Sequence, residues 1–450
     1  MRPRSALVCA IVASLVGSMA AAASRRPARA SVAVPLPASA VHHLEPHQFL
    51  APPSAGDCLE RYQLRCYSAD QIRAAYDVGP LLAHGNDGAG TTIAVVVSYG
   101  SPTIEADVRV FDAAWGLPDP PSIETITPAG SVPDFDPSDA GMAGWAFETS
   151  LDVEYAHLIA PRASILVVAT PVSETDGVAG FPEIVQAENY VIEHGRADVI
   201  TQSLGAAEQT FPSAERIRSL RSAFVNAARH GVTVVAAAGD SGATDFENDQ
   251  ETLFPYRVDS WPSTDPLVTS VGGTRLHLDA AGRRSAPDTT WNDDYGAGGG
   301  GLSTVFGRPA YQERVRAVVG DARGTPDVAL SAAVDGGVLV YTSYDADSSG
   351  WSVVGGTSEA APLFAGMVAL AAQRAKHPLG AINPALYRLA TRPNSGIVDV
   401  NSGDNSYADV TGYTARPGYD LATGLGTIDA SRFVPALAGA AGKPSLPLSG

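Results

Sequence analysis

Residues 355–362 read Gly-Gly-Thr-Ser-Glu-Ala-Ala-Pro, and a nearly continuous run of small apolar residues follows from Ala360 to Ala375. The two glycines allow a sharp turn, and the run predicts a helix that is packed on all sides. We therefore expect Ser358 to be exposed near a helix N-terminus, where free N–H groups favour a developing oxyanion. Pro362 fits the first turn of such a helix. A helix cap without a catalytic role explains the same residues equally well.

A base is needed to activate a serine, because a hydroxyl group is a weak nucleophile. None of the nine histidines lies in a His-Gly-Thr-His sequence, so a carboxylate is the next candidate. Glu148 and Asp152 are four residues apart and share one helical face. Such a pair is most often solvated, but the apolar neighbours between Trp145 and Val153 favour partial burial. A partly buried acid pair raises one pKa and provides a usable general base.

Alternating apolar strands and helices predict an α/β fold with a mostly parallel sheet and helices on both faces. Asp240, in Ala-Gly-Asp-Ser-Gly at 238–242, would lie just beyond a strand. Open α/β sheets place their sites there, although an ordinary Asx turn is the alternative. The expected strands are 93–97, 164–168, 199–203 and 233–238, and the expected helices are 104–115, 184–194 and 213–230.

Taken together, the segments around Ser358, Glu148 and Asp240 resemble the sedolisins, which are serine-carboxyl peptidases with a subtilisin-like fold. The resemblance covers about residues 67–429, and the segments occur in the family's order. It implies a mostly parallel central sheet flanked by helices on both faces. Further matching segments are Tyr67–Ile72, Val271–Thr274, Gly298–Ser303, Pro326–Val328 and Gly418–Asp420.

Residue roles follow from this resemblance. It makes Ser358 the nucleophile, Glu148 the general base, Asp152 the acid that orients Glu148, and Asp240 the acid of the oxyanion hole. To donate a hydrogen bond to an oxyanion, Asp240 must be protonated, and an unperturbed aspartate titrates near pH ~3.9. We therefore expect an acid-active endopeptidase that forms an acyl-enzyme on Ser358.

Substrate contacts are predicted at a strand end. By analogy with subtilisin-like sites, Ser203, Leu204 and Gly205 would line the cleft and pair with an extended polypeptide substrate. A plain turn from strand to loop explains these three residues almost as well.

The segments 399–403 and 416–420 predict one structural calcium ion. They combine two carboxylates with glycine-rich turns, and oxygen ligands suit calcium. Two ordinary aspartate turns would look the same, but the segments are similar to the calcium loop of sedolisins. The implied ligands are the Asp399 and Asp420 side chains and the carbonyls of Val400, Arg416 and Gly418.

The chain of 450 residues carries a formal net charge of -18. Such an acidic chain is a poor nucleic-acid ligand, so we expect polypeptide substrates and no nucleic acid. We expect a monomer with one large catalytic domain, residues 67–440, and a flexible tail, residues 441–450. No later apolar run is long enough to predict a membrane anchor.

The first 23 residues predict a signal peptide with a basic start, an apolar stretch and a small-residue cleavage site, and hence a secreted protein. With Cys9 in the leader, Cys58 and Cys66 remain, and two cysteines in an exported chain most simply pair. The short segment 24–66, whose first part reads as a flexible linker, leaves no room for the long propeptide that is usual in sedolisins.

Other functions fit parts of the sequence. A tripeptidyl-peptidase would use the same residues, and a catalytically inactive secreted binding protein could share the fold. However, inactive members commonly lose a site residue, and all four are present. An esterase is disfavoured, because no Gly-x-Ser-x-Gly motif surrounds Ser358.

Overall fold

The computed structural model describes residues 41–42, 51–174, 179–346 and 349–441. All of these belong to one compact unit, Val34–Gly450. The expected signal peptide, much of the linker after it, and nearly all of the expected C-terminal tail lie outside the described residues. The domain boundaries from the sequence therefore stay predictions.

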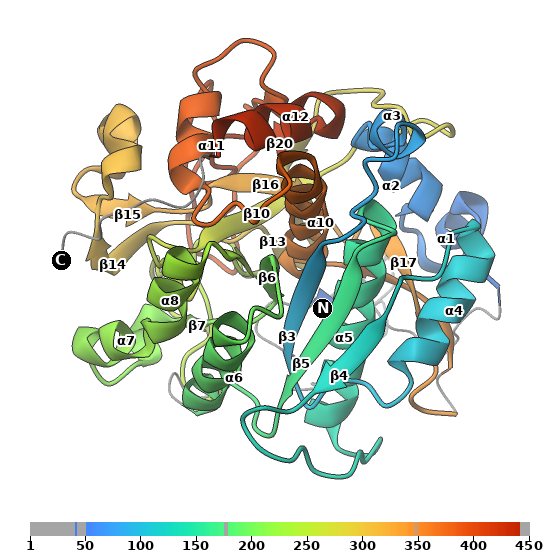
Figure 1. Ribbon diagram of the computed structural model, residues 1–450. Helices are drawn as coiled ribbons and strands as arrows, with labels where there is room; N and C mark the ends of the chain where they lie inside the picture. The colour runs from blue at the N-terminus through green and yellow to red at the C-terminus, as the bar shows by residue number, and fades with distance from the viewer. Residues whose placement is uncertain (1–40, 43–50, 175–178, 347–348, 442–450) are drawn as a thin grey trace, which may run out of the picture. The chain divides into compact units, whose positions relative to one another are not determined.

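An eight-stranded sheet forms the centre of this unit (Figure 1). Its strands run in the order β11-β10-β8-β6-β3-β5-β4, and β16 pairs with β10. All pairs are parallel except that of β10 with β11. This confirms the predicted fold class. The strands are β3 (Thr92–Ser98), β4 (Ile123–Ile126), β5 (Ser164–Thr170), β6 (Val199–Gln202), β8 (Thr233–Ala237), β10 (Thr269–Arg275), β11 (Thr289–Thr290) and β16 (Val328–Ser331).

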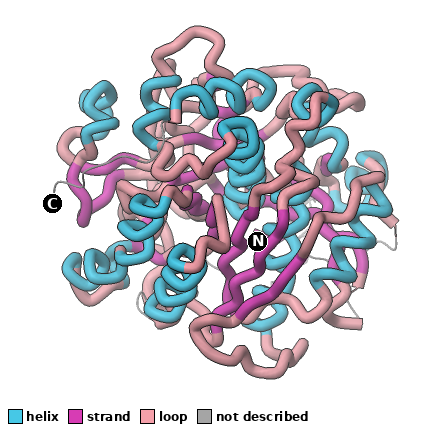
Figure 2. Tube along the Cα trace, in the orientation of Figure 1, coloured by secondary structure: helices cyan, strands magenta, loops and turns pink. Residues whose placement is uncertain are grey.

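Helices cover both faces of the sheet (Figures 1 and 2). On one face α5 (Ala140–Ile159) packs against α10 (Thr357–Ala375), and on the other α6 (Phe181–Glu193) packs against α8 (Ser222–His230). The first pair approaches closely at Gly366, where a Cβ atom would lie 2.7 Å from the Cβ of Ile159. A larger residue there would push α10 away from α5.

The segment 213–230, predicted as one helix, forms two. α7 (Ala214–Leu220) ends at Arg221, whose ψ of 1° leaves the helical region, and α8 begins at Ser222. The Arg221 guanidinium lies 2.9 Å from a carboxylate oxygen of the buried Asp265. We attribute the break to this ion pair, because it fixes the side chain of the residue at which the chain turns.

A second sheet, β1-β18-β17-β2, leads into α10. A single residue, Gly356, separates its strand β18 (Gly350–Gly355) from α10. The disulfide bond between Cys58 and Cys66 joins α1 to β2, as predicted. The elements not yet given are β1 (Val41–His42), α1 (Ala55–Tyr62), β2 (Cys66–Tyr67), α2 (Ala69–Ala75), α3 (Gly79–Ala83), α4 (Ile104–Trp115), β7 (Ala206–Ala207), η1 (Glu208–Thr210), β9 (Ser260–Trp261), β12 (Asn292–Asp293), β13 (Gly296–Ala297), β14 (Leu302–Gly307), η2 (Ala310–Val315), α9 (Arg316–Val319), β15 (Ala322–Gly324), β17 (Gly337–Thr342), α11 (Asn383–Leu389), β19 (Ile397–Val398), β20 (Thr427–Ile428) and α12 (Ala430–Ala440).

Within the described ranges, no helix combines the length and apolar character needed to cross a membrane.

A buried ion pair fixes the approach to β16. Arg323 and Asp327 are both fully buried, and two of their nitrogen–oxygen pairs are 2.8 and 2.5 Å apart. The Asp327 carboxylate also accepts hydrogen bonds from the Tyr387 hydroxyl at 2.9 Å and from the Ser270 amide at 2.9 Å. Removing one partner of such a pair leaves an uncompensated buried charge.

We expect Asp327→Asn to lower the free energy of unfolding by about 3–5 kcal/mol, because it leaves Arg323 charged and unpaired in the core. Urea unfolding followed by tryptophan fluorescence measures this loss. Asp321→Asn is the matched control, since Asp321 is fully exposed in its pair with Arg308, and its unfolding midpoint should stay unchanged. Equal midpoints for the two variants would contradict the assignment.

Candidate active site

Helix α5 carries the two acids of the candidate site. Glu148 and Asp152 lie one turn apart, and both side chains are fully buried rather than partly buried as expected. The reason is that α5 is buried around its whole circumference from Gly144 to Ile159. Both carboxyl groups are therefore removed from bulk water.

The candidate nucleophile follows a sharp turn. Gly356 has a φ of 138°, which favours glycine, and α10 begins at the next residue. Ser358 is thus the second residue of α10, which agrees with its predicted position near a helix N-terminus. Its side chain is fully buried, which corrects the expectation of an exposed serine. The burial arises because α10 packs on β6, β8 and α5.

Pro362 lies inside α10 and not in its first turn, which is a second correction. The helix begins at Thr357, three residues earlier than the apolar run suggested. A proline has no N–H to donate to the carbonyl four residues earlier, so residue 362 makes no hydrogen bond to the carbonyl of Ser358. The hydroxyl oxygen of Ser203 lies 3.5 Å from this carbonyl oxygen.

Asp240 lies just beyond β8, as predicted, and meets the start of α10. Its Oδ1 accepts hydrogen bonds from the Thr357 amide at 2.7 Å and from the Thr357 hydroxyl at 2.8 Å. Its Oδ2 is buried and has no hydrogen-bond partner among the described residues. A proton on Oδ2 would thus be available to a substrate oxygen beside Ser358.

The pKa of each candidate acid is raised. Burial raises the pKa of Glu148, while the nearby hydroxyls of Ser358 and Ser203 favour the ionised carboxylate and lower it. Burial and the neighbouring Glu148 charge raise the pKa of Asp152, and the Ser203 hydroxyl opposes this. Burial raises the pKa of Asp240, Thr357 hydrogen bonds lower it, and the Glu148 charge raises it further. These interactions show that Ser358, Glu148, Asp152 and Asp240 lie close together in one site.

Ser203 does more than the sequence indicated. Its hydroxyl donates to Asp152 Oδ1 at 2.7 Å and also contacts Glu148. The residue predicted to bind substrate backbone therefore bridges both acids. Thr357, which hydrogen-bonds to Asp240, is not predicted as a site residue from the sequence. It directly precedes Ser358 in the segment 355–362.

Leu204 and Gly205 line a small cavity of about 10 Å³ beside Gly239 and Trp261. This volume holds about one water molecule. The cavity lies between the end of β6 and the turn that carries Asp240. The predicted role of residues 203–205 in substrate binding stays a prediction.

The predicted calcium ligands gather around one loop. Asp399 Oδ2 accepts from the Gly418 amide at 2.9 Å, and Asp420 Oδ2 accepts from the Arg416 amide at 2.7 Å. The Val400 carbonyl accepts from the Thr423 hydroxyl at 3.2 Å. In the part of the chain that the structure describes, no group of three or more His, Cys, Asp or Glu residues could hold a metal ion. A site here would depend on two carboxylates and backbone carbonyls.

Comparison with known proteins places this arrangement in context. Residues 140–392 match the subtilase family. A solved structure titled "Pseudomonas sedolisin (serine-carboxyl proteinase) complexed with two molecules of pseudo-iodotyrostatin" superposes with a TM-score of 0.70. The two chains are 26% identical, and the match covers 84% of this chain and 99% of the sedolisin chain.

Curated relatives agree with this likeness. Kumamolisin from Bacillus sp. (strain MN-32) is 37% identical over 78% of this chain and 61% of its own length. Human tripeptidyl-peptidase 1 (Homo sapiens) is 30% identical over 64% of this chain and 50% of its own length. The chain thus spans about three fifths or less of the curated relatives that it matches.

The buried acids predict a fold that is more stable in acid. Glu188 on α6 is fully buried, and burial raises its pKa from 4.5 to about 8. A raised pKa means that the fold favours the neutral carboxyl. This stabilisation is present below pH ~4.5 and is lost as the pH rises to about 8, by roughly 3–5 kcal/mol for one such group. Glu148, Asp152 and Asp240 act in the same direction.

We expect the melting temperature to fall between pH 4.5 and pH 8, and Glu188→Gln to reduce this fall, because glutamine stays neutral at every pH. Differential scanning calorimetry across this range measures the effect. Glu183→Gln, at a partly exposed position of the same helix, should leave the slope unchanged. A melting temperature that rises with pH in the wild type would contradict the sign.

Proposed function

We propose that this chain, which belongs to the subtilase family and is similar to sedolisin and kumamolisin, hydrolyses peptide bonds as a serine-carboxyl endopeptidase. The observation that carries the proposal is the placement of Ser358 against the Glu148 carboxyl, with the free Oδ2 of Asp240 beside the start of the same helix. A nucleophile, a base and an acid for the oxyanion are the groups that acyl transfer requires.

In the first step Glu148 takes the proton of the Ser358 hydroxyl while Oγ attacks the carbonyl carbon of the scissile peptide. Protonated Asp240 donates a hydrogen bond from Oδ2 to the oxygen that becomes negative. Glu148 then gives its proton to the leaving amine as the carbon–nitrogen bond breaks. An acyl-enzyme on Ser358 remains, and a water molecule releases it by the same steps in reverse.

Asp152 and Ser203 support the base. When Glu148 is ionised, a proton on Asp152 limits the repulsion between two buried carboxylates one turn apart. The Ser203 hydroxyl donates to Asp152 and stabilises the charge on Glu148. We infer that these two residues position Glu148 and do not contact the reacting atoms.

Acid activity is part of this proposal. Asp240 has to keep its proton to act as a donor, and burial and the Glu148 charge favour that protonated form. The buried acids also favour an acid environment for folding. We further propose that the protein is secreted, on the strength of the basic and apolar pattern of residues 1–23.

Two alternatives concern the same site. A tripeptidyl-peptidase would use the same four residues, and one group of curated relatives carries that name. A catalytically inactive binding protein would not need a buried base against Ser358. The complete set of four groups supports the peptidase, and analysis of cleavage products distinguishes internal cuts from the removal of N-terminal tripeptides.

We expect the wild type to cleave a denatured protein with highest activity in acid, and Ser358→Ala to abolish cleavage at every pH from 2 to 8. Asp240→Ala should lower kcat by roughly 100- to 1000-fold, because it removes an oxyanion donor. Asp240→Asn should lower kcat less, because the asparagine amide can donate a hydrogen bond to the oxyanion at every pH. Ser219→Ala, an exposed serine on α7, is the control. Full activity of Ser358→Ala would refute the proposal.

We also propose that the loop formed by residues 416–420 holds one structural calcium ion with Asp399 and Asp420. Support comes from the donor set, since two carboxylates converge on the same loop and oxygen atoms are the ligands that calcium prefers. The carbonyls of Val400, Arg416 and Gly418 would complete the coordination. The ion would stabilise the loop and would take no part in the reaction.

Calcium should raise the melting temperature of the wild type by several degrees at saturation, because an ion that binds only the folded state stabilises it. Asp420→Asn should abolish this rise, and Asp409→Asn, on a neighbouring exposed turn, should keep it. Scanning calorimetry with calcium, with magnesium and with a chelator makes the measurement. No difference between calcium and chelator in the wild type would overturn the site.

A further inference from the structure

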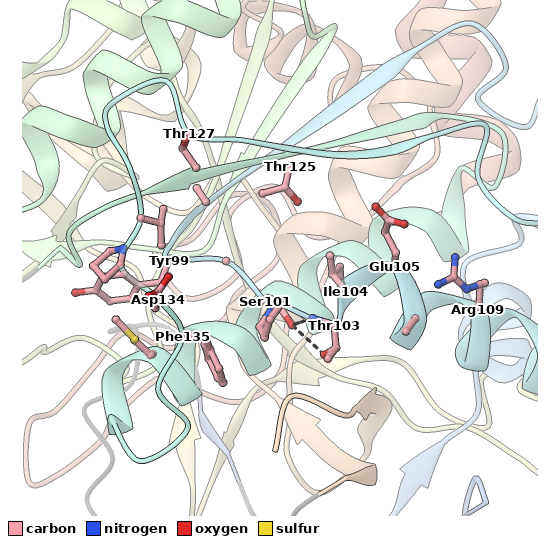
Figure 3. A pocket seen from close by; sticks show the side chains of 17 residues that line it. Tyr99, Ser101, Thr103, Ile104, Glu105, Arg109, Thr125, Thr127, Asp134 and Phe135 are labelled. Carbon is pink, nitrogen blue, oxygen red and sulfur yellow. Dashed lines mark hydrogen bonds between the residues drawn. The ribbon is translucent and has the colours of Figure 1, made fainter. Parts of the chain in front are cut away.

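A second, much larger pocket opens at the same edge of the central sheet as the candidate catalytic residues. It has a volume of about 700 Å³ and lies where β3, β4 and β5 end, between the first turn of α4 and the start of α5 (Figure 3). This volume is within the range of pockets that bind small molecules or parts of larger ligands. Nothing in the mechanism above uses it.

The lining of the pocket combines apolar and aromatic side chains with the hydroxyls of Ser101, Thr103, Thr125 and Thr127, and its charged residues lie at the surface. Tyr99, Ile104, Val132, Phe135 and Met142 contribute apolar or aromatic side chains. Phe135 is held by an edge-to-face contact with Tyr344, with the ring centres 5.9 Å apart. The three charged lining residues are all exposed, and they are Glu105, Arg109 and Asp134.

The pocket continues the edge that carries the candidate active site. Asp240 follows β8, Ser203 follows β6, and Tyr99 follows β3, and these three strands are neighbours in that order. Adjacent strands lie about 4.8 Å apart, and an extended peptide advances about 3.3 Å per residue. A peptide that passes Ser358 along this edge would therefore reach the pocket within a few residues.

The wall of the pocket is also tied to the helix that carries the base. Tyr99 adopts a φ of 58°, which is uncommon for a residue with a side chain. Its hydroxyl accepts a hydrogen bond from the Ser173 amide at 3.2 Å. The Ser173 hydroxyl in turn accepts from the Trp145 indole at 3.0 Å, and Trp145 lies three residues before Glu148 on α5. The pocket and the base are thus held in a fixed relation.

We propose that this pocket is a specificity subsite, which binds a large apolar or aromatic side chain of the substrate two to five residues away from the scissile bond. The proposal rests on the proposed peptidase function. The apolar and aromatic part of the lining selects the class of side chain, and the continuity with the candidate catalytic edge identifies the occupant as the substrate polypeptide. The site therefore selects substrates that extend well beyond the scissile bond.

Two substitutions test the subsite without touching the catalytic residues. Thr125→Trp places a large side chain in the pocket from an exposed position of β4, and Phe135→Ala enlarges the pocket. The matched control is Gln186→Trp, an exposed position that lines a different surface cavity between α6 and α8. A peptide library varied at each position from five residues before to five residues after the scissile bond gives the preference.

We expect the wild type to select large apolar residues at one position of the library. Thr125→Trp should lower kcat/KM for those peptides by roughly 10- to 100-fold, mostly through KM, and should leave short peptides that cannot reach the pocket unaffected. Phe135→Ala should weaken the preference for large apolar residues at that position of the library and at no other position. The same order of affinities should appear when labelled long peptides bind to Ser358→Ala, which tests the subsite without catalysis.

Peptides that bind Ser358→Ala equally well with and without Thr125→Trp would overturn the subsite, even if the wild type cleaves them. A change at all positions of the library, or an equal effect of Gln186→Trp, would overturn it as well. If long peptides bind with the expected preference and the wild type cuts none, the subsite stands as a peptide-binding site and the proposed peptidase function fails.

Discussion

Everything at the candidate site depends on the close packing of α5 against α10. One helix carries both candidate acids, and the candidate nucleophile Ser358 is the second residue of the other, so the packing of the two helices determines how Ser358 lies relative to Glu148. Gly366 permits the contact, because its missing side chain makes room for Ile159. A buried helix pair is rigid, which suits a reaction in which the geometry of proton transfer has to be preserved.

Burial of this kind has a chemical consequence. A carboxyl group in the core is neutral over a wider pH range than one in water, and five acids with raised pKa values lie on or beside this helix pair. Besides Glu148, Asp152 and Asp240 these are Glu154 on α5 and Glu359, which directly follows Ser358, and burial is the largest cause that raises the pKa of each. Histidine-based sites use a group that titrates near neutrality. Here the buried carboxyl groups favour their neutral forms, and the hydroxyls of Ser358 and Ser203 favour ionisation of Glu148.

Much of the fold could be predicted from the sequence, because buried parallel strands and an all-apolar helix leave strong patterns. The bounds of α4 agree with the prediction, and β3, β5, β6 and β8 differ from it by one or two residues at an end. The failures came from tertiary contacts. No local signal predicts that Arg221 pairs with a distant Asp265 and divides a helix, or that the helix after Gly356 starts early enough to bury Ser358 and place Pro362 in its interior. The contacts of Ser203 and Thr357 with the acids also join residues from different strands and helices, which spacing along the chain does not reveal.

The opposite protonation states that the proposed reaction requires of Glu148 and Asp240 are linked by the structure. Glu148 has to lose its proton to act as a base, and Asp240 has to keep its proton to act as a donor. The negative charge of Glu148 raises the pKa of Asp240, so ionisation of the base holds the proton on the donor. Interacting buried groups titrate as a unit, and hydroxyls from Ser358 and Ser203 lower the pKa of Glu148. The state with an ionised Glu148 and a protonated Asp240 is therefore favoured over the state with both groups ionised. This coupling allows two carboxyl groups with similar ordinary pKa values to take opposite roles in one site.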